Sequence, residues 1–154
     1  MHTEPLAPLV QGFFREYLVA QRNASHNTIQ TYRDSIKLLL SFAADRFGRP
    51  VTDLHVGHVE PDTVIAFLDS LGRERGCGTA TRNTRLAAIR SFFRYVARRQ
   101  PEIADLCRRV TEIPPKKGEI VQPTYLELDE LNAIFDGIDR STSLGRRDYA
   151  LLWL

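Results

Sequence analysis

The stretch from Gly78 to Arg99 has the residue types and the spacing needed to hold a polyanion against one side of a helix. Its apolar residues recur at helical spacing and predict a face that packs on a core: Leu86, Ile89, Phe93 and Val96. A second stripe, rotated to one side, is polar and mainly basic: Asn83, Ala87, Arg90, Arg94 and Arg98. Guanidinium groups repeated along a helix bind phosphates through charge, so the pattern favours contact with a polyanion. A solvated basic surface helix is the alternative.

Short hydroxyl side chains and one long cation crowd the first turn of this predicted helix, at Thr79, Thr81, Arg82 and Thr84. That mixture suits a helix N-terminus directed at phosphates or base edges. A second predicted helix has a polar stripe opposite its apolar face, at His26, Gln30, Arg33 and Lys37, with Asn27, Thr28 and Thr31 near its start. Two such helices can lie in neighbouring parts of a DNA major groove, which is wide enough for a helix.

The charges are distributed unevenly, although the formal net charge of the 154-residue chain is only +2. Residues 75–118 contain 11 Lys and Arg against 3 Asp and Glu, a net charge of +8. The segments on either side, residues 1–74 and 119–154, have net charges of −2 and −4. A concentrated basic block between acidic segments is the electrostatic pattern expected of a surface that binds nucleic acid.

No catalytic residue, metal site or cofactor site is predicted within the chain. Cys77 and Cys107 do not form a CxxC pair, and His55 and His58 lie in a predicted loop, so neither pair indicates a zinc site. The first residues lack the charge and apolar core of a secretory signal, and no run of about 18 apolar residues exists. The expected location is therefore the cytoplasm, with both thiols free and no contact with a membrane.

Apolar residues at helical spacing predict an all-α fold, a compact bundle of four to five helices. The expected helices span residues 8–22, 25–46, 61–71 and 79–99, with a short fifth helix after Pro101 and a loop over residues 49–60. Ser25 is a good cap for the second helix, and Gly48 with Pro50 ends it. Pro61 suits the first position of the third.

A stretch rich in Pro, Gly and Lys predicts a domain boundary over residues 113–124. The expected domains are residues 1–112 and 125–154, the latter beginning with a helix around Leu128, Leu131, Ile134 and Phe135. The chain ends on an uncovered apolar run, Leu151 to Leu154. We therefore expect an N-terminal fragment of a longer protein, with residues 125–154 as the truncated start of a second helical domain.

Four motifs, in order along the chain, resemble the N-terminal half of the tyrosine recombinases, the phage-integrase-like site-specific DNA recombinases. Ser25-x-x-Thr28-Ile29-x-x-Tyr32-Arg33 is similar to the second helix of that family. Gly78-Thr79-x-Thr81-Arg82, followed by Arg85-Leu86-x-Ala88-Ile89-Arg90-x-Phe92-Phe93-x-Tyr95, is similar to its fourth. Tyr125-Leu126 with Leu128-Asp129-Glu130-Leu131 resembles the opening of the catalytic domain, and Arg147-Asp148-Tyr149-Ala150-Leu151-Leu152 resembles the helix before the first catalytic arginine. Glu127 departs from the Ser or Thr that usually caps the first of these helices.

The resemblance implies a SAM-like, core-binding helical domain that holds one face of duplex DNA, while a second domain holds the other face and does the chemistry. The family's catalytic arginines, lysine, histidines and tyrosine nucleophile would all lie downstream of this sequence, and Tyr149 is expected to have a packing role. The chain should then bind double-stranded DNA without cutting it. Its parent would transfer DNA strands through a tyrosyl–phosphate intermediate.

The two polar helix faces give a defined set of candidate DNA-binding residues. Those expected to contact phosphates are Lys37, Arg90, Arg94, Arg98 and Lys116. Those expected to reach base edges are Asn27, Gln30, Thr31, Asn83 and Thr84, while Arg82 suits either task. The predicted site comprises Asn27, Thr28, Gln30, Thr31, Arg33, Lys37, Thr79, Thr81, Arg82, Asn83, Thr84, Arg90 and Arg94.

Two other functions remain open from the sequence: a helical module whose basic helix recognises an acidic protein, and a helix-turn-helix regulator without recombinase activity. The join from Gly72 to Gly78 is longer than the tight turn of a helix-turn-helix. The family resemblance also implies contacts with other recombinase subunits on paired DNA sites. Phe13 and Phe14 are a candidate subunit contact because adjacent aromatics cannot both face one core. Alternatively, one of them covers the loop that follows the second helix.

Overall fold

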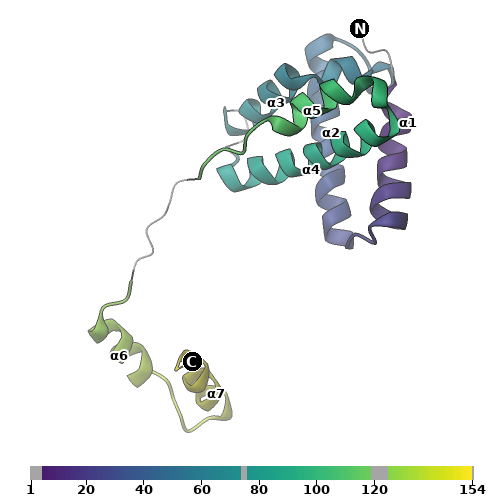
Figure 1. Cartoon of the computed structure of the whole chain (residues 1–154). Helices are drawn as coiled ribbons and strands as arrows, with labels where there is room; N and C mark the ends of the chain where they lie inside the picture. The colour runs from purple at the N-terminus through teal and green to yellow at the C-terminus, as the bar shows by residue number, and fades with distance from the viewer. Residues whose placement is uncertain (1–4, 74–75, 119–124, 154) are drawn as a thin grey trace. The chain divides into compact units, whose positions relative to one another are not determined.

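A computed structural model describes residues 5–73, 76–118 and 125–153 (Figure 1). The chain divides into two compact units, Met1–Gly118 and Glu119–Leu154. The described residues form helices and no strand, as predicted for an all-α fold. Residues 119–124 of the predicted linker lie outside the described residues.

The first unit is built of successive helices joined by short turns. In order they are α1 (Leu6–Gly12), η1 (Phe13–Gln21), α2 (His26–Phe47), η2 (Val51–Asp53), η3 (Val56–Val59), α3 (Pro61–Arg73), α4 (Thr79–Arg99), η4 (Pro101–Ile103) and α5 (Ala104–Glu112). The predicted caps of α2 are confirmed. The Ser25 side chain accepts a hydrogen bond from the Thr28 amide at 3.2 Å, and Gly48 ends the helix in the left-handed conformation with a φ of 60°.

Helix α4 lies at the centre of the unit, beside α5 and in contact with α2 and α3 (Figure 1). The predicted apolar stripe is buried in full, and the opposite flank is also covered. The buried residues of α4 are Leu86, Ala88, Ile89, Ser91, Phe92, Phe93, Tyr95 and Val96. Between Leu86 and Val96 only Ala87, Arg90 and Arg94 are not buried, so a narrow strip of this part of the helix reaches the surface, and it belongs to the basic stripe named from the sequence.

The predicted boundaries need correction at three places. The first helix begins at Leu6, and its second half, η1, is a π-helix, in which the Arg22 amide donates to the Tyr17 carbonyl at 2.9 Å. Helix α3 continues through Gly72 to Arg73. The loop predicted for residues 49–60 contains two short 3-10 turns, η2 and η3. Leu54, between them, and Val56 and Val59, in η3, are fully buried in the core. Three separate apolar residues form no periodic pattern, so the sequence did not predict these turns.

Phe13 joins α4 and α2 to η1 through aromatic contacts. Its buried ring lies 5.4 Å from Phe92, 5.7 Å from Tyr95 and 6.3 Å from Tyr32, centre to centre. The neighbouring Phe14 is half-buried against the core and lines a cavity together with Val51, in the turn that follows α2. This arrangement agrees with the second of the two roles considered for the Phe13–Phe14 pair, cover of that turn.

The second unit contains α6 (Leu128–Asp136) and α7 (Ser143–Leu152). The Glu127 amide donates to the Glu130 carboxylate at 2.9 Å, so the start of α6 is capped although Ser or Thr is absent. Tyr149 packs on Phe135 with ring centres 5.4 Å apart, in agreement with a packing role. Large apolar side chains of this unit remain exposed, among them Leu128, Leu151 and Trp153.

Among the residues that the structure describes, no helix is both long enough and apolar enough to cross a membrane.

Within the first unit, Gly12 is a position where the fold leaves no room for a side chain. A Cβ atom at Gly12 would overlap the hydroxyl oxygen of Tyr95 and lie 3.4 Å from its Cζ atom. We expect Gly12→Ala to lower the free energy of unfolding by about 1–3 kcal/mol, the usual cost of overpacking. In a Tyr95→Phe background the same change should cost less than 1 kcal/mol, because only the hydroxyl is in the way. Urea unfolding of the four proteins measures this, and an equal cost in both backgrounds would contradict it.

The two thiols should differ sharply in reactivity. Cys107 is fully buried, and that burial raises the pKa of its thiol to about 11, whereas Cys77 is partly exposed. We expect a disulfide reagent at pH 8 to label one thiol of the native chain rapidly and the second only on unfolding. Cys77→Ser should remove the rapid phase. Rapid labelling of two thiols in the native chain would show that α5 does not protect Cys107.

Candidate nucleic-acid interface

Helices α2 and α4 bring hydroxyl side chains together in one groove. A cavity of about 310 Å³ is lined by Thr31, Asp34 and Ser35 from α2 and by Ala80, Thr81, Thr84 and Arg85 from α4. Three predicted site residues, Thr31, Thr81 and Thr84, therefore lie on one surface although Thr31 and Thr81 are 50 positions apart along the chain. The groove has the short donors and acceptors that could approach a base edge.

Most of these side chains are already oriented by their own helix. The Thr31 hydroxyl donates to the Asn27 carbonyl at 2.8 Å, and the Thr84 hydroxyl donates to the Ala80 carbonyl at 3.0 Å. Each oxygen keeps lone pairs that can accept a further hydrogen bond. Thr28 is different, because its hydroxyl lies 2.9 Å from that of the capping Ser25. Gln30 donates to the Asp34 carboxylate at 3.2 Å, and both side chains are exposed, as is Asn27.

A second cavity, of about 490 Å³, lies at the start of α4 and gathers positive charge. Its lining includes Arg73 from α3, Thr79 and Arg82 from α4, and Lys116 from the segment after α5. Asp69 and Cys77 also line it. Three cations from different parts of the sequence thus share one cavity with one carboxylate, so the cavity is suited to an anion.

Arg33 and Lys37 lie apart from these two cavities. They line a third, largely apolar cavity with Val10, Phe14 and Ile36, on the side of α2 that faces α1 and η1. The sequence placed them on one polar stripe with Gln30. The structure shows that this stripe is broad enough to border two different grooves, and that Thr31 borders the one nearer α4.

Two predicted contacts on α4, Asn83 and Arg90, are engaged within the chain. The Asn83 side chain forms hydrogen bonds with the backbone of Lys116, and Arg90 donates to the carbonyl of Ile113. Arg94 is exposed on the same strip. Within the described residues, no carboxylate forms an ion pair with Arg82 or Arg94.

The end of α4 is occupied by contacts to η1. Arg99 forms an ion pair with Glu16 and lies over the Tyr95 ring, 5.4 Å from its centre. Arg98 lies 5.9 Å from the centre of the Tyr17 ring. These arginines support the fold through cation–π and ionic contacts, so the cations that remain open on α4 are concentrated toward its first half and at Arg94.

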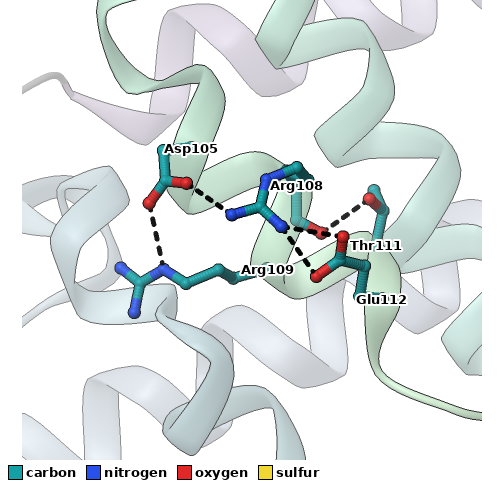
Figure 2. A network of polar contacts seen from close by, with 5 residues as sticks. All are labelled: Asp105, Arg108, Arg109, Thr111 and Glu112. Atoms are coloured by element: carbon teal, nitrogen blue, oxygen red, sulfur yellow. Dashed lines mark hydrogen bonds and ion pairs between the residues drawn. The ribbon is translucent and has the colours of Figure 1, made fainter.

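Helix α5 neutralises much of its own charge (Figure 2). Arg108 bonds Asp105 at 2.7 Å and Glu112 at 2.8 Å, and Arg109 lies 3.4 Å from Asp105. The hydrogen bond from Arg108 holds the pKa of Asp105 below its usual value. The net charge of +8 on residues 75–118 therefore overstates the charge available to a partner, because the cations of α5 are paired within one helix.

Sequence reasoning missed the place of Asp34 and Arg85 in the groove between α2 and α4. Asp34 is not among the predicted site residues. Its position three residues after Thr31 is the one signal that could have placed it beside the predicted site. Arg85 donates to the Cys77 sulfur at 4.0 Å, a contact that follows from the turn before α4 and not from helical spacing.

His55 and His58 have a local structural arrangement. The His55 amide donates to Nδ1 of His58 at 2.9 Å, and the His58 ring packs on Phe47 with centres 4.9 Å apart. Among the described residues, no group of three or more metal-ligating side chains is found.

Comparison with known proteins agrees with this architecture. The family described as "Phage integrase, N-terminal SAM-like domain" matches residues 11–100. The chain is 42% identical over 147 residues to a putative integrase/recombinase, y4rC, of Sinorhizobium fredii, with 96% of this chain and 44% of the relative covered. It is 40% identical to a second, y4rD, of the same organism, covering 52% of that relative.

A tyrosine recombinase XerC of Pelobacter propionicus is 29% identical over 150 residues, which cover 97% of this chain and 46% of that protein. No solved structure matches the chain significantly. The chain spans about half the length of these curated relatives. The match to the family over most of the first unit, and to integrases and recombinases over nearly the whole chain, establishes the relationship. The chain belongs to the phage integrase family of tyrosine recombinases, and residues 11–100 are its N-terminal SAM-like domain.

Proposed function

We propose that this chain is the DNA-binding arm of a site-specific tyrosine recombinase and grips duplex DNA at the recombination site through α2 and α4. The observation that supports this best is the groove in which Thr31 of α2 meets Thr81 and Thr84 of α4, close in sequence to the cationic cavity of Arg73, Arg82 and Lys116. Hydroxyls that can reach base edges, flanked by cations that can hold phosphates, are the two components of sequence-specific binding.

The two kinds of contact divide among the candidate residues. Base edges are assigned to Asn27, Gln30, Thr31, Thr81 and Thr84, around the groove. Phosphates are assigned to Arg33, Lys37, Thr79, Arg82, Arg94 and Lys116, with Thr28 supporting the start of α2 through its bond to Ser25. Arg33 and Lys37 lie on the far side of α2, so we assign them to the backbone at the edge of the footprint.

We assign residues 1–112 to the core-binding domain, 113–124 to the linker and 125–154 to the start of the catalytic domain. The relatives named as recombinases are about twice as long as this chain, and strand transfer is proposed for such a longer protein. This chain would bind DNA without cleaving it. The exposed apolar side chains of α6 and α7 are the surface that the rest of a catalytic domain would cover. Other recombinase subunits on paired DNA sites are the proposed protein partners.

A protein-interaction module with an acidic partner is the second candidate, because the cationic cavity of Arg73, Arg82 and Lys116 could also receive carboxylates. The dependence of binding on salt and the choice of competitor separate the two. A DNA arm that neutralises about 6 phosphates loses affinity with a log–log salt slope near −5.

The first prediction from this proposal concerns phosphate contacts. We expect anisotropy titrations with a fluorescent duplex to show this steep slope, and Arg82→Ala with Arg94→Ala to flatten it by about 2. Arg108→Ala with Arg109→Ala removes the same formal charge from α5, where both arginines are paired with carboxylates. That control should leave the slope nearly unchanged. Equal effects of the two double variants would mean that net charge alone determines binding, and no binding at low salt would favour the protein partner.

The second prediction concerns base contacts in the groove. Thr84→Val keeps the shape of the side chain and removes its hydroxyl. We expect it to reduce the preference for a duplex selected from a random pool over a random duplex by about 2- to 12-fold, the equivalent of roughly 0.5–1.5 kcal/mol for one hydrogen bond. The salt slope should stay the same, because no charge is lost. Thr52→Val, in the η2 turn, is a matched control that should keep the preference. A change in slope without a change in preference would contradict a base-reading role.

A further inference from the structure

Asn83 holds a segment that lies 33 positions further along the chain. Its side-chain nitrogen donates to the Lys116 carbonyl at 2.8 Å, and its side-chain oxygen accepts from the Lys116 amide at 2.9 Å. One amide side chain thus satisfies both backbone groups of one residue, as a neighbouring strand would. Arg82 also donates to the same Asn83 oxygen, at 3.4 Å, which helps to orient the amide.

Arg90 holds the same segment at a second point. It lies two turns after Asn83 on the same side of α4, and its guanidinium donates to the Ile113 carbonyl. Ile113 is only 6% exposed, so its side chain anchors the segment in the core. The Nε atom of Arg90 is buried and has no hydrogen-bond partner within the described residues. The Arg90 guanidinium is thus directed at the backbone of Ile113. It is poorly placed to offer all of its N–H donors to a phosphate.

The spacing of the two anchors fits the segment between them. Seven residues of α-helix rise about 10 Å, and the three steps from Ile113 to Lys116 span about 9 Å in a polyproline conformation. The two intervening residues are Pro114 and Pro115. Their rings fix φ, and they have no backbone N–H group that needs an acceptor. The segment therefore runs antiparallel to α4, stiff between its two points of attachment.

We propose that Asn83 and Arg90 form a clamp that docks residues 113–116, the first four residues of the proposed linker, on α4 and places Lys116 in the cationic cavity with Arg73 and Arg82. Asn83 and Arg90 are then positioning residues, and Lys116 is the group that would meet a phosphate. The placement of residues 113–116 is independent of the function proposed above. The role of Lys116 rests on that function, so the two are tested separately.

The clamp itself is tested by amide exchange in the 154-residue chain without DNA. We expect the Lys116 amide to exchange slowly in the natural sequence and at least about fivefold faster in Asn83→Ala, since its acceptor is lost. Arg90→Ala should also accelerate it. Thr84→Ala, whose hydroxyl bonds only within α4, is the control and should leave Lys116 unchanged. Continued slow exchange in the buried parts of α2 and α4 shows that a variant is folded. A Lys116 amide that exchanges freely in the natural sequence, or that ignores Asn83→Ala, would overturn the clamp.

The consequence for DNA is tested by the salt slope. Asn83 is neutral and cannot itself release counterions, so loss of a direct contact by Asn83 would weaken binding with the slope unchanged. If Asn83 acts by placing Lys116, then Asn83→Ala and Lys116→Ala should each flatten the slope by about 1, and the double variant should do no more. Additive losses, or an unchanged slope in Asn83→Ala, would overturn the positioning role. Failure of the natural chain to bind any duplex would refute the proposed function and leave the exchange result standing.

Discussion

The burial of α4 is the constraint on which the rest of the first unit depends. Eight residues of this helix are buried, on both sides of the stripe that its hydrophobic periodicity marks. Helices α2, α3, α5, η1 and η4 all contact it, and the Phe13 ring of η1 packs on Phe92 and Tyr95 of α4. Because so little of the middle of α4 reaches the surface, the side chains of its exposed strip there have few possible neighbours. What each of them can do for the domain depends on which neighbour it contacts.

The contacts made by the surface side chains of α4 change from its start to its end. At its start, Thr81, Thr84 and Arg82 border cavities open to a ligand. In the middle, Asn83 and Arg90 hold the segment that follows α5. At its end, Arg98 and Arg99 contact Tyr17, Tyr95 and Glu16. In the function proposed above, a basic helix that looks uniform in sequence has one end for binding, a middle for positioning and one end for stability.

The same division explains why net charge is a poor guide to the interface. Arg108 and Arg109 account for part of the basic block, yet they are paired with Asp105 and Glu112 on the surface of α5. Exposed pairs of this kind contribute little to stability. Their effect is to neutralise positive charge on the face of α5, whereas Arg73, Arg82 and Lys116 line one cavity where three parts of the chain converge.

Much of this architecture could be predicted from the sequence, because the signals that define a helix lie within a few residues of one another. Ser25 and Gly48 mark the ends of α2, and the spacing of Leu86, Ile89, Phe93 and Val96 marks the core face of α4. The family was evident from four short motifs in order. The burial of Leu54, Val56 and Val59 could not be predicted, because short turns have no hydrophobic periodicity. The π-helical form of η1 could not be predicted either.

Individual roles in the site were decided only by tertiary structure. Asn83 and Thr84 are adjacent and equally polar, but one meets the backbone of Lys116 and the other borders the groove with Thr31. Sequence determined which residues share a helix face, since helical geometry depends on neighbours a few positions apart. Which of those residues is free for a ligand depends on segments that return from more than twenty positions away, such as Ile113 to Arg90, and that return is set by how the helices pack.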